Sequence, residues 1–219
     1  MQAIFTGVFV AAFCLCAQGP ETQTKEIRGL PPRATPSDYQ AQAQAGGMTV
    51  AAEFVGHFVP TLQGNLTTED YVVVETGMFG PPEAHIKLLL GDFSLRINGK
   101  KTALPAQPYG MVIKSLKDPD WEPAAAESSS RSKTNVLTGG KGVGDGGKDK
   151  DPPAPVQIPI EVQRAMQQRI QKASLPEGDR TVPVAGLIFF QYSGRTQGIR
   201  SIELIYNGSV GNVTLELRP

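Results

Sequence analysis

The chain has 219 residues, with 21 basic and 21 acidic side chains, so its formal net charge is zero. This balance excludes the basic footprint of a nucleic-acid-binding protein and the polybasic run that would hold a protein on an anionic membrane. The length allows one domain, or a small domain with tails, and it is sufficient for a hydrophobic core.

The first 17 residues are uncharged, and residues 4–17 form one predominantly apolar stretch. This stretch is shorter than the roughly 20 residues of a membrane-spanning helix, and it fits the core of a secretory signal peptide. It departs from that pattern because Met1–Ala3 lacks a Lys or Arg; a buried strand and a membrane-peripheral segment are the alternatives. We expect residues 1–17 to be cleaved and the protein to be secreted or periplasmic, with no transmembrane helix in the mature chain.

Both cysteines, Cys14 and Cys16, lie inside this predicted signal peptide. A mature chain would then contain no thiol, so neither a disulfide nor a cysteine nucleophile is expected. Lipidation is not favoured, because Phe13 and Leu15 stand where lipoprotein signals carry a small residue before the cysteine.

Residues 18–47 are predicted to form a flexible leader. The segment contains four prolines, scattered charges and an alternation of Gln and Ala at Gln40–Ala45. Such a composition favours an extended or disordered chain. We expect order to begin near Met48, where an alternation of apolar and polar residues starts.

Short runs with a period of two residues predict antiparallel strands. In the first predicted strand, one face is expected to consist of Val50, Ala52, Phe54 and Phe58. The run at Tyr71–Val74 is continuous and β-branched, which is typical of a central strand. The other predicted strands are Phe93–Ile97, Leu187–Tyr192, Ile199–Tyr206 and Val213–Leu217.

A hairpin is predicted after the strand Phe93–Ile97. The next two residues, Asn98-Gly99, are the strongest short-range signal for it, because both central positions of a type I′ turn need positive φ. The return strand is expected at Lys100–Leu104 and a further short strand at Tyr109–Leu116, whereas Asn65–Asp70 is expected to be a loop.

Residues 122–156 are predicted to be a disordered insert rich in Gly, Ser, Pro, Lys and Asp. They contain almost no large apolar side chain, so they cannot offset the entropy cost of ordering. The ordered domain is therefore expected in two parts, 48–121 and 157–219.

One helix is predicted at Pro159–Ser174. Pro159 suits the first helical position, and Glu161 suits the positive N-terminal end of the helix dipole. The helix is expected to pack on the sheet through one apolar stripe, formed by Val162, Met166, Ile170 and Ala173. Presentation of this stripe to a partner is the alternative; membrane-surface binding is disfavoured because the stripe is narrow.

Together these elements predict a mainly β domain, an antiparallel β-sandwich of about seven or eight strands with one helix. Five segments also follow one another in a recognisable order: Val72–Glu75, Asp92–Gly99, Leu175–Gly178, Gly186–Phe190 and Ile202–Tyr206. In this order they resemble the immunoglobulin-like domains of unknown function found in secreted proteins and lipoproteins of bacteria. The resemblance covers most of residues 48–117 and 175–217. It implies an Ig-like sandwich exported from a bacterium, and it supplies no catalytic residue.

Other motifs argue against catalysis. His57 and His85 belong to no cluster with metal-ligand spacing, so a zinc site is not expected. Gly142–Lys148 has the spacing of a phosphate-binding loop, but Asp149 replaces the magnesium-binding Ser or Thr, and no apolar strand precedes it. No G-x-S-x-G turn occurs in the sequence. We therefore expect no catalytic residue, no metal and no cofactor.

The candidate binding residues are Trp121, Arg195 and Tyr192. Trp121 stands among acidic residues and prolines where the predicted insert begins, and it is either a plug or an exposed recognition aromatic. Arg195 lies in the predicted loop Ser193–Gly198, directly after the strand that ends at Tyr192. Sandwich domains bind partners through such end loops, through exposed edges or through a sheet face.

We expect a non-catalytic binding or accessory module of the bacterial envelope, whose partner is an envelope or extracellular protein and not a nucleic acid. A small-ligand or carbohydrate binder is the alternative, and it predicts quenching of Trp121 on binding. A hydrolase is the third possibility, and it predicts loss of turnover when His57 or His85 is replaced.

Overall fold

The structure, a computed structural model, describes residues 29–121 and 158–219. The predicted signal peptide and the predicted insert lie outside the described residues. The described chain is mainly β, with antiparallel sheets and two α-helices, α1 (Tyr109–Val112) and α2 (Ile160–Ala173). Neither of these helices is long and apolar enough to cross a membrane.

Eight strands form the main sheet in the spatial order β1-β2-β5-β11-β8-β7-β12-β13, and every neighbouring pair is antiparallel. Their bounds are β1 (Ala41–Ala45), β2 (Met48–Gly56), β5 (Tyr71–Phe79), β7 (Phe93–Ile97), β8 (Leu104–Gln107), β11 (Val184–Gln191), β12 (Ile202–Gly208) and β13 (Gly211–Leu217). Two smaller sheets contain β3 (Phe58–Thr61), β4 (Gly64–Thr68) and β9 (Leu116–Lys117), and β6 (His85–Leu88) with β10 (Gly178–Thr181).

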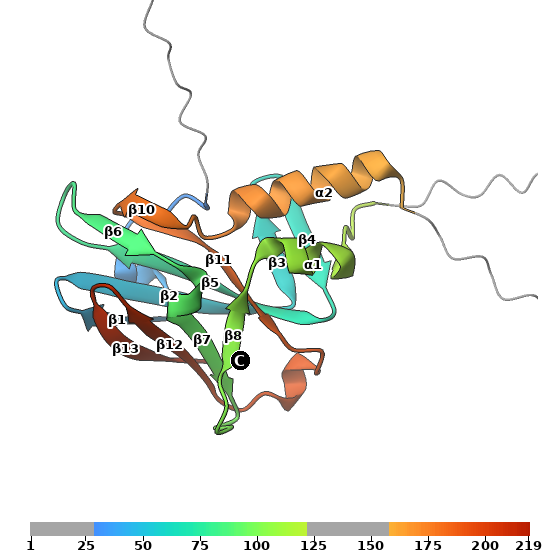
Figure 1. Ribbon diagram of the computed structural model, residues 1–219. Coiled ribbons are helices and arrows are strands. Elements are labelled where there is room, and N and C mark those ends of the chain that lie inside the picture. The colour runs from blue at the N-terminus through green and yellow to red at the C-terminus, as the bar shows by residue number, and fades with distance from the viewer. Residues whose placement is uncertain (1–28, 122–157) are drawn as a thin grey trace, which may run out of the picture.

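The main sheet curls until its first and last strands, β1 and β13, lie side by side (Figure 1). At one end of this seam Gln40 Nε2 donates a hydrogen bond to the backbone oxygen of Arg218 at 3.0 Å. At the other end the approach is so close that a side chain at Gly46 would collide with the backbone oxygen of Val210. The predicted mainly β, antiparallel class is confirmed, and the main sheet is barrel-like where the sequence predicts two facing sheets.

Strands β5 and β11 pair with each other and separate two hydrophobic cores. Inside the curled sheet the first core includes Val72, Val74, Ile188 and Phe190. On the outer face of the same two strands the second core includes Tyr71, Val73, Leu187 and Phe189. Successive residues of each strand therefore face the two cores in turn. This explains why the sequence of both strands is an uninterrupted apolar run. The prediction of a central strand at Tyr71–Val74 agrees with this position.

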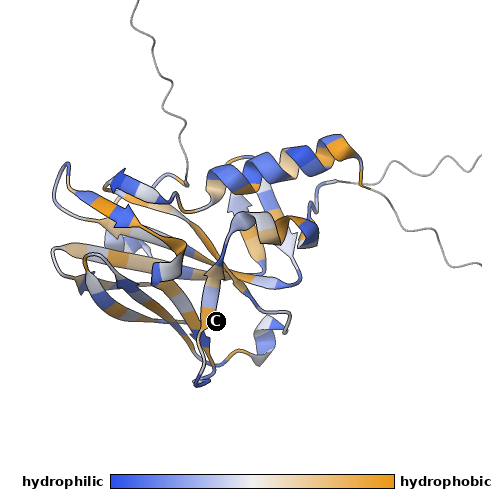
Figure 2. Cartoon of the chain, in the orientation of Figure 1, coloured by the Kyte–Doolittle hydropathy of each residue, from blue (hydrophilic) through white to orange (hydrophobic). Residues whose placement is uncertain are grey.

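Helix α2 covers the outer core together with α1, β9 and the β3–β4 hairpin (Figure 1). Met166, Ile170 and Ala173 are buried, and Val162 packs at the margin of the same core. The rest of the helix is largely hydrophilic (Figure 2). The predicted apolar stripe thus packs on the sheet, although Pro159 precedes the first helical residue instead of being it.

Two segments that the sequence predicts to be irregular are strands. β1 lies inside the predicted leader 18–47, so order begins before Met48. Its alanines face the core while its glutamines face solvent. β4 occupies most of the predicted loop Asn65–Asp70, and its one large apolar residue, Leu66, is fully buried. Both strands carry too little apolar surface for periodicity to identify them.

Three predicted features in the first half of the domain are wrong. A register shift between Phe54 and Gly56 ends the alternation in β2, and Phe58 begins β3 with 58% of its surface exposed instead of facing the core. Tyr109–Leu116 forms α1 and a 3-10 turn, with β9 beginning only at its last residue. The Asn98-Gly99 turn does have positive φ at both positions, but its return strand starts later, at Leu104.

Replacing Ile170 with Ala tests how far the outer core depends on α2. Ile170 is fully buried, and removal of a buried Ile side chain costs about 2–5 kcal/mol. We expect the free energy of unfolding, measured by urea denaturation, to fall by about this amount. The matched control is Ile160→Ala, because Ile160 lies on the same helix and is 51% exposed. Equal losses from the two variants would contradict the packing of α2 described above.

Candidate functional site

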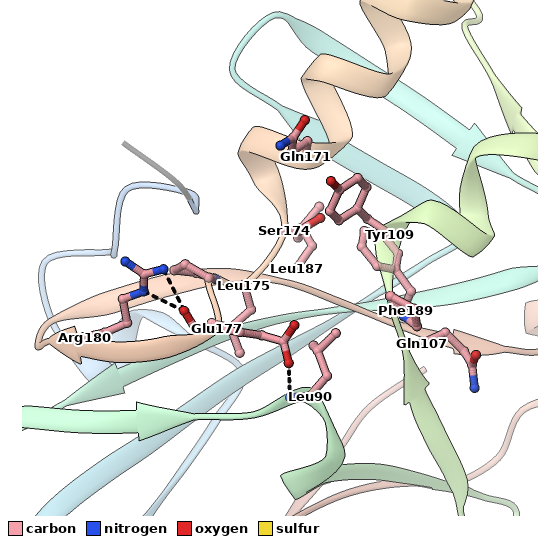
Figure 3. A pocket seen from close by; sticks show the side chains of 12 residues that line it. Leu90, Gln107, Tyr109, Gln171, Ser174, Leu175, Glu177, Arg180, Leu187 and Phe189 are labelled. Atoms are coloured by element: carbon pink, nitrogen blue, oxygen red, sulfur yellow. Dashed lines mark hydrogen bonds between the residues drawn. The ribbon is translucent and has the colours of Figure 1, made fainter. Parts of the chain in front are cut away.

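A cavity of about 170 Å³ lies beside β11, where that strand changes neighbours (Figure 3). β8 pairs with β11 only at Phe189 and Phe190. Nearer the start of β11, the segment that follows α2 lies beside the strand in place of β8. There Leu175 N donates a hydrogen bond to the backbone oxygen of Leu187 at 2.9 Å. The cavity lies between these two neighbours, and residues from α1 and from the end of α2 complete its walls.

The cavity has an apolar floor and a polar rim. Leu175, Leu187 and Phe189 are buried and form the floor. The rim draws hydrogen-bonding side chains from several elements, namely Gln107, Tyr109, Gln171, Ser174, Glu177 and Arg180. An apolar concavity with a few convergent polar groups is the usual composition of a ligand-binding site.

Some of the rim groups already bind other parts of the protein. Arg180 donates two hydrogen bonds to the backbone oxygen of Glu177, at 3.0 and 2.6 Å. One carboxylate oxygen of Glu177 accepts a bond from Leu90 N at 3.0 Å. In the described part of the chain, the hydroxyl of Tyr109 and the amide of Gln171 make no such bond, and both lie at the mouth of the cavity (Figure 3). These two groups are therefore free to meet a ligand.

The volume of the cavity matches a single ring-sized apolar group. An apolar protein cavity of about 150 Å³ binds benzene, so the space beside β11 accommodates one aromatic ring or one branched aliphatic side chain. A polar substituent on that group would meet Tyr109 or Gln171 at the rim. Ser174 Oγ, in the wall of the cavity, donates to the backbone oxygen of Ile170 at 2.6 Å. The arrangement is suited to binding a group of this size.

The structure brings together two of the three predicted binding residues. Arg195 is exposed and lines an open hollow of about 400 Å³ beyond the end of β11. Tyr192 does not line the hollow itself, but it is half-buried and stacks on His57, which does, with ring centroids 6.5 Å apart. Trp121 lies elsewhere, half-buried after β9, and lines neither this hollow nor the cavity beside β11.

His57 holds the hollow's loop in place, which sequence reasoning missed. Its Nδ1 lies 2.7 Å from the backbone oxygen of Tyr71, and its Nε2 lies 2.9 Å from the backbone oxygen of Gly194. Both ring nitrogens thus face backbone acceptors, and the imidazole in its neutral form donates its one N–H to one of the two oxygens. Gly194 is 137 residues away in the sequence, so no local signal could reveal this contact. The other histidine, His85, is exposed beside Asp179.

A pair of carboxylates on the outer face of the sheet also has a structural role. Glu53 on β2 lies directly opposite Glu75 on β5, an arrangement that is destabilising for like charges without a counterion. Arg33 supplies the counterion: its Nε and Nη2 donate to the Glu75 carboxylate at 3.2 and 2.8 Å, and its Nη1 contacts Glu53. The guanidinium lies 4.5 Å from the centroid of the Tyr39 ring. These contacts fasten residues 29–39 to the sheet.

Tyr39 makes this fastening sensitive to alkaline pH. Burial raises the pKa of Tyr39 above its ordinary value of 10.0, although a hydrogen bond from the backbone N–H of Arg33 opposes the rise. Above about pH 10 an unfolded Tyr loses its proton while the folded Tyr39 keeps it, so stability falls as the pH rises. We expect urea denaturation above pH 10 to show a smaller loss of stability in Tyr39→Phe than in the unmodified protein. The same loss in both proteins would contradict this role.

Replacing His57 with Ala should loosen the loop that carries Arg195. A neutral imidazole carries one N–H, so the backbone oxygen of Tyr71 or that of Gly194 would lose its donor, which costs about 1–3 kcal/mol of unfolding free energy. Hydrogen exchange should quicken in residues 193–198 and stay unchanged in α2. The control is His85→Ala, because His85 is exposed and its loss should change stability by less than about 0.5 kcal/mol. Unchanged exchange in the loop of His57→Ala would refute the holding role.

Comparison with known proteins yields no relative. No protein-family model, no curated protein and no solved structure matches the chain. The chemistry of the cavity and of the hollow therefore rests on the residues that line them.

Proposed function

We propose that the chain is an exported, non-catalytic binding module that recognises a ring-sized apolar group in the cavity beside β11. The observation that carries this proposal is the apolar floor of Leu175, Leu187 and Phe189 beneath the free polar groups of Tyr109 and Gln171. A ligand with one ring and one polar substituent buries the first and hydrogen-bonds through the second. Export is inferred from the apolar segment at residues 1–17, and the motif order supports kinship with bacterial Ig-like envelope proteins.

The occupant that fits best is an aromatic or branched aliphatic side chain of an envelope or extracellular protein. Protein interfaces commonly depend on one such side chain buried in a pocket of the partner. Met111 favours a partner of this size, because it lies on the same short helix as Tyr109 and is 58% exposed. An apolar surface next to the cavity is of use to a protein partner and of little use to a small molecule that fills only the cavity.

Non-catalytic binding is supported by how the reactive side chains are used. His57 is engaged at both ring nitrogens, and Arg33 covers the paired carboxylates of Glu53 and Glu75. Within residues 29–121 and 158–219, no group of three or more His, Cys, Asp or Glu side chains could hold a metal ion. The use of His57 and of the carboxylate pair in structural contacts favours a binding module over the hydrolase alternative.

The test is to plug the cavity by replacing Gln171 with Trp. Gln171 lines the mouth of the cavity on the last turn of α2, so an indole there would fill the entrance without removing a core contact. The mature chain, residues 18–219, is titrated with p-cresol and with indole and followed by NMR. We expect dissociation constants on the order of 1 mM, because so few atoms make contact. Shifts should centre on Leu187 and Phe189 and disappear in Gln171→Trp.

Gln168→Trp is the matched control, because Gln168 is an exposed residue of the same helix and does not line the cavity. Crosslinked capture from an envelope fraction then separates the two sources of the ring. A partner captured by the unmodified chain and by Gln168→Trp, but not by Gln171→Trp, supports a protein side chain. Ring binding without such a partner supports a free small ligand. Failure of both rings to bind the unmodified chain would overturn the proposal.

A further inference from the structure

The hollow at Arg195 is more open than the cavity beside β11, and it is lined by polar types of residue. Apart from Gly194, every residue that lines it is polar: His57, Thr67, Thr68, Glu69, Ser193, Arg195, Thr196 and Gln197. The hollow is open, with a volume of about 400 Å³. One wall of the hollow already contacts other parts of the protein, through His57, Thr67, Thr68 and Glu69. The hydrogen-bonding groups that the hollow offers to a ligand are therefore those of the loop Ser193–Gln197.

An aromatic surface adjoins this polar hollow. A second hollow of about 240 Å³ shares His57 and Thr196 with the first, and it is lined in addition by Phe54, Phe58 and Pro219. Phe58 is 58% exposed, an unusual state for an aromatic side chain whose burial would stabilise the fold. The molecule thus presents one accessible aromatic ring beside a row of hydroxyl, amide and guanidinium groups.

The backbone that carries the polar groups is held in place before any ligand arrives. His57 contacts the backbone oxygen of Gly194, Tyr192 N donates to the backbone oxygen of Asp70 at 2.8 Å, and Ile199 N donates to that of Thr196 at 2.9 Å. A side chain at residue 194 would come within 2.6 Å of the Tyr192 ring, so any residue other than glycine there would have to displace that ring. A preformed loop loses less entropy on binding than a mobile one.

The charges around the hollow exclude two classes of ligand. Glu69 is paired with Lys117 Nζ at 2.5 Å, so Arg195 is the one ionised side chain of the lining without an ion pair among the described residues. A single guanidinium does not retain a polyanion such as nucleic acid, whose affinity depends on many phosphate contacts. It does repel a strongly cationic ligand. A neutral or weakly acidic ligand remains.

We propose that the two hollows, joined at His57 and Thr196, form a binding site for a carbohydrate chain. A pyranose ring has an apolar face of C–H groups and a rim of hydroxyls. Phe58 offers the aromatic surface for the first, and Arg195 and Gln197 offer hydrogen bonds for the second. Because the site is open, it suits several sugars of a chain lying along the surface. The site is separate from the cavity beside β11 and does not rest on the function proposed for that cavity.

The experiment uses linear oligosaccharides of glucose, of N-acetylglucosamine and of uronic acids as probes, first on an array and then by calorimetry. The mature chain is compared with Phe58→Ala and Arg195→Ala, both of which remove exposed side chains. We expect at least one probe to bind the unmodified chain, and each variant to weaken that binding by about 10-fold or more, with unchanged thermal unfolding. Phe58→Trp should retain or strengthen the binding, since it keeps an aromatic surface.

Leu89→Ala is the control, because Leu89 is a second exposed apolar residue, at 44%, that lines neither hollow. Gln171→Trp should leave sugar binding unchanged, which separates this site from the cavity beside β11. Absence of binding to all the probes would overturn the proposal. So would binding that both Phe58→Ala and Arg195→Ala leave intact, or binding of uronic acids that salt abolishes and Phe58→Ala does not affect. Capture of an extended peptide at this surface in place of every sugar would assign it to protein recognition instead.

Discussion

Burial of β5 and β11 on both faces is the constraint on which the rest of the structure depends. Strands that are apolar on both faces need a cover on each side, because neither face can be left in water. The curl of the main sheet covers one face, and α1, α2, β9 and the β3–β4 hairpin cover the other. The second cover is assembled from separate pieces. The cavity beside β11 exists because two of these pieces meet over Leu187 and Phe189 without filling the space between them.

Polar contacts fix how the pieces of the outer cover sit on the sheet. Apolar packing alone would allow α2 to shift along the outer core, since the hydrophobic effect has no direction. Arg169 on α2 pairs with Asp118 after β9 at 2.5 Å, and each side chain is only 13% exposed. Arg33 and His57 act in the same way on the N-terminal segment and on the loop after β11. Each contact joins residues far apart in sequence, so together they specify one arrangement of a cover built from short elements.

The parts of the fold that could be predicted from the sequence are those that depend on neighbouring residues. The uninterrupted run at Tyr71–Val74 indicates a central strand by itself, and the spacing of Met166 and Ile170 indicates one face of a helix. β1 could not be predicted, because alanine and glutamine carry little signal and the strand is ordered by pairing with β2. The cavity could not be predicted either. In the sequence Leu187 has the pattern of an ordinary core residue and Gln171 that of an ordinary helix-surface residue, and only the fold brings them together.

The pairing of β5 with β11 also bears on how the protein is made. Met78 pairs with Val184, more than a hundred residues later in the chain. During synthesis β2 and β5 are complete long before β11 and α2 exist, so one edge of β5 stays unpaired and its outer face lacks the cover of α2 in the nascent chain. Such surfaces are prone to aggregation. The equilibrium cost of the separation is small, about 0.6 kcal/mol for each doubling of loop length. A longer segment between β5 and β11 therefore hardly lowers the stability of the folded protein. It does lengthen the time during which the incomplete sheet must be protected from aggregation.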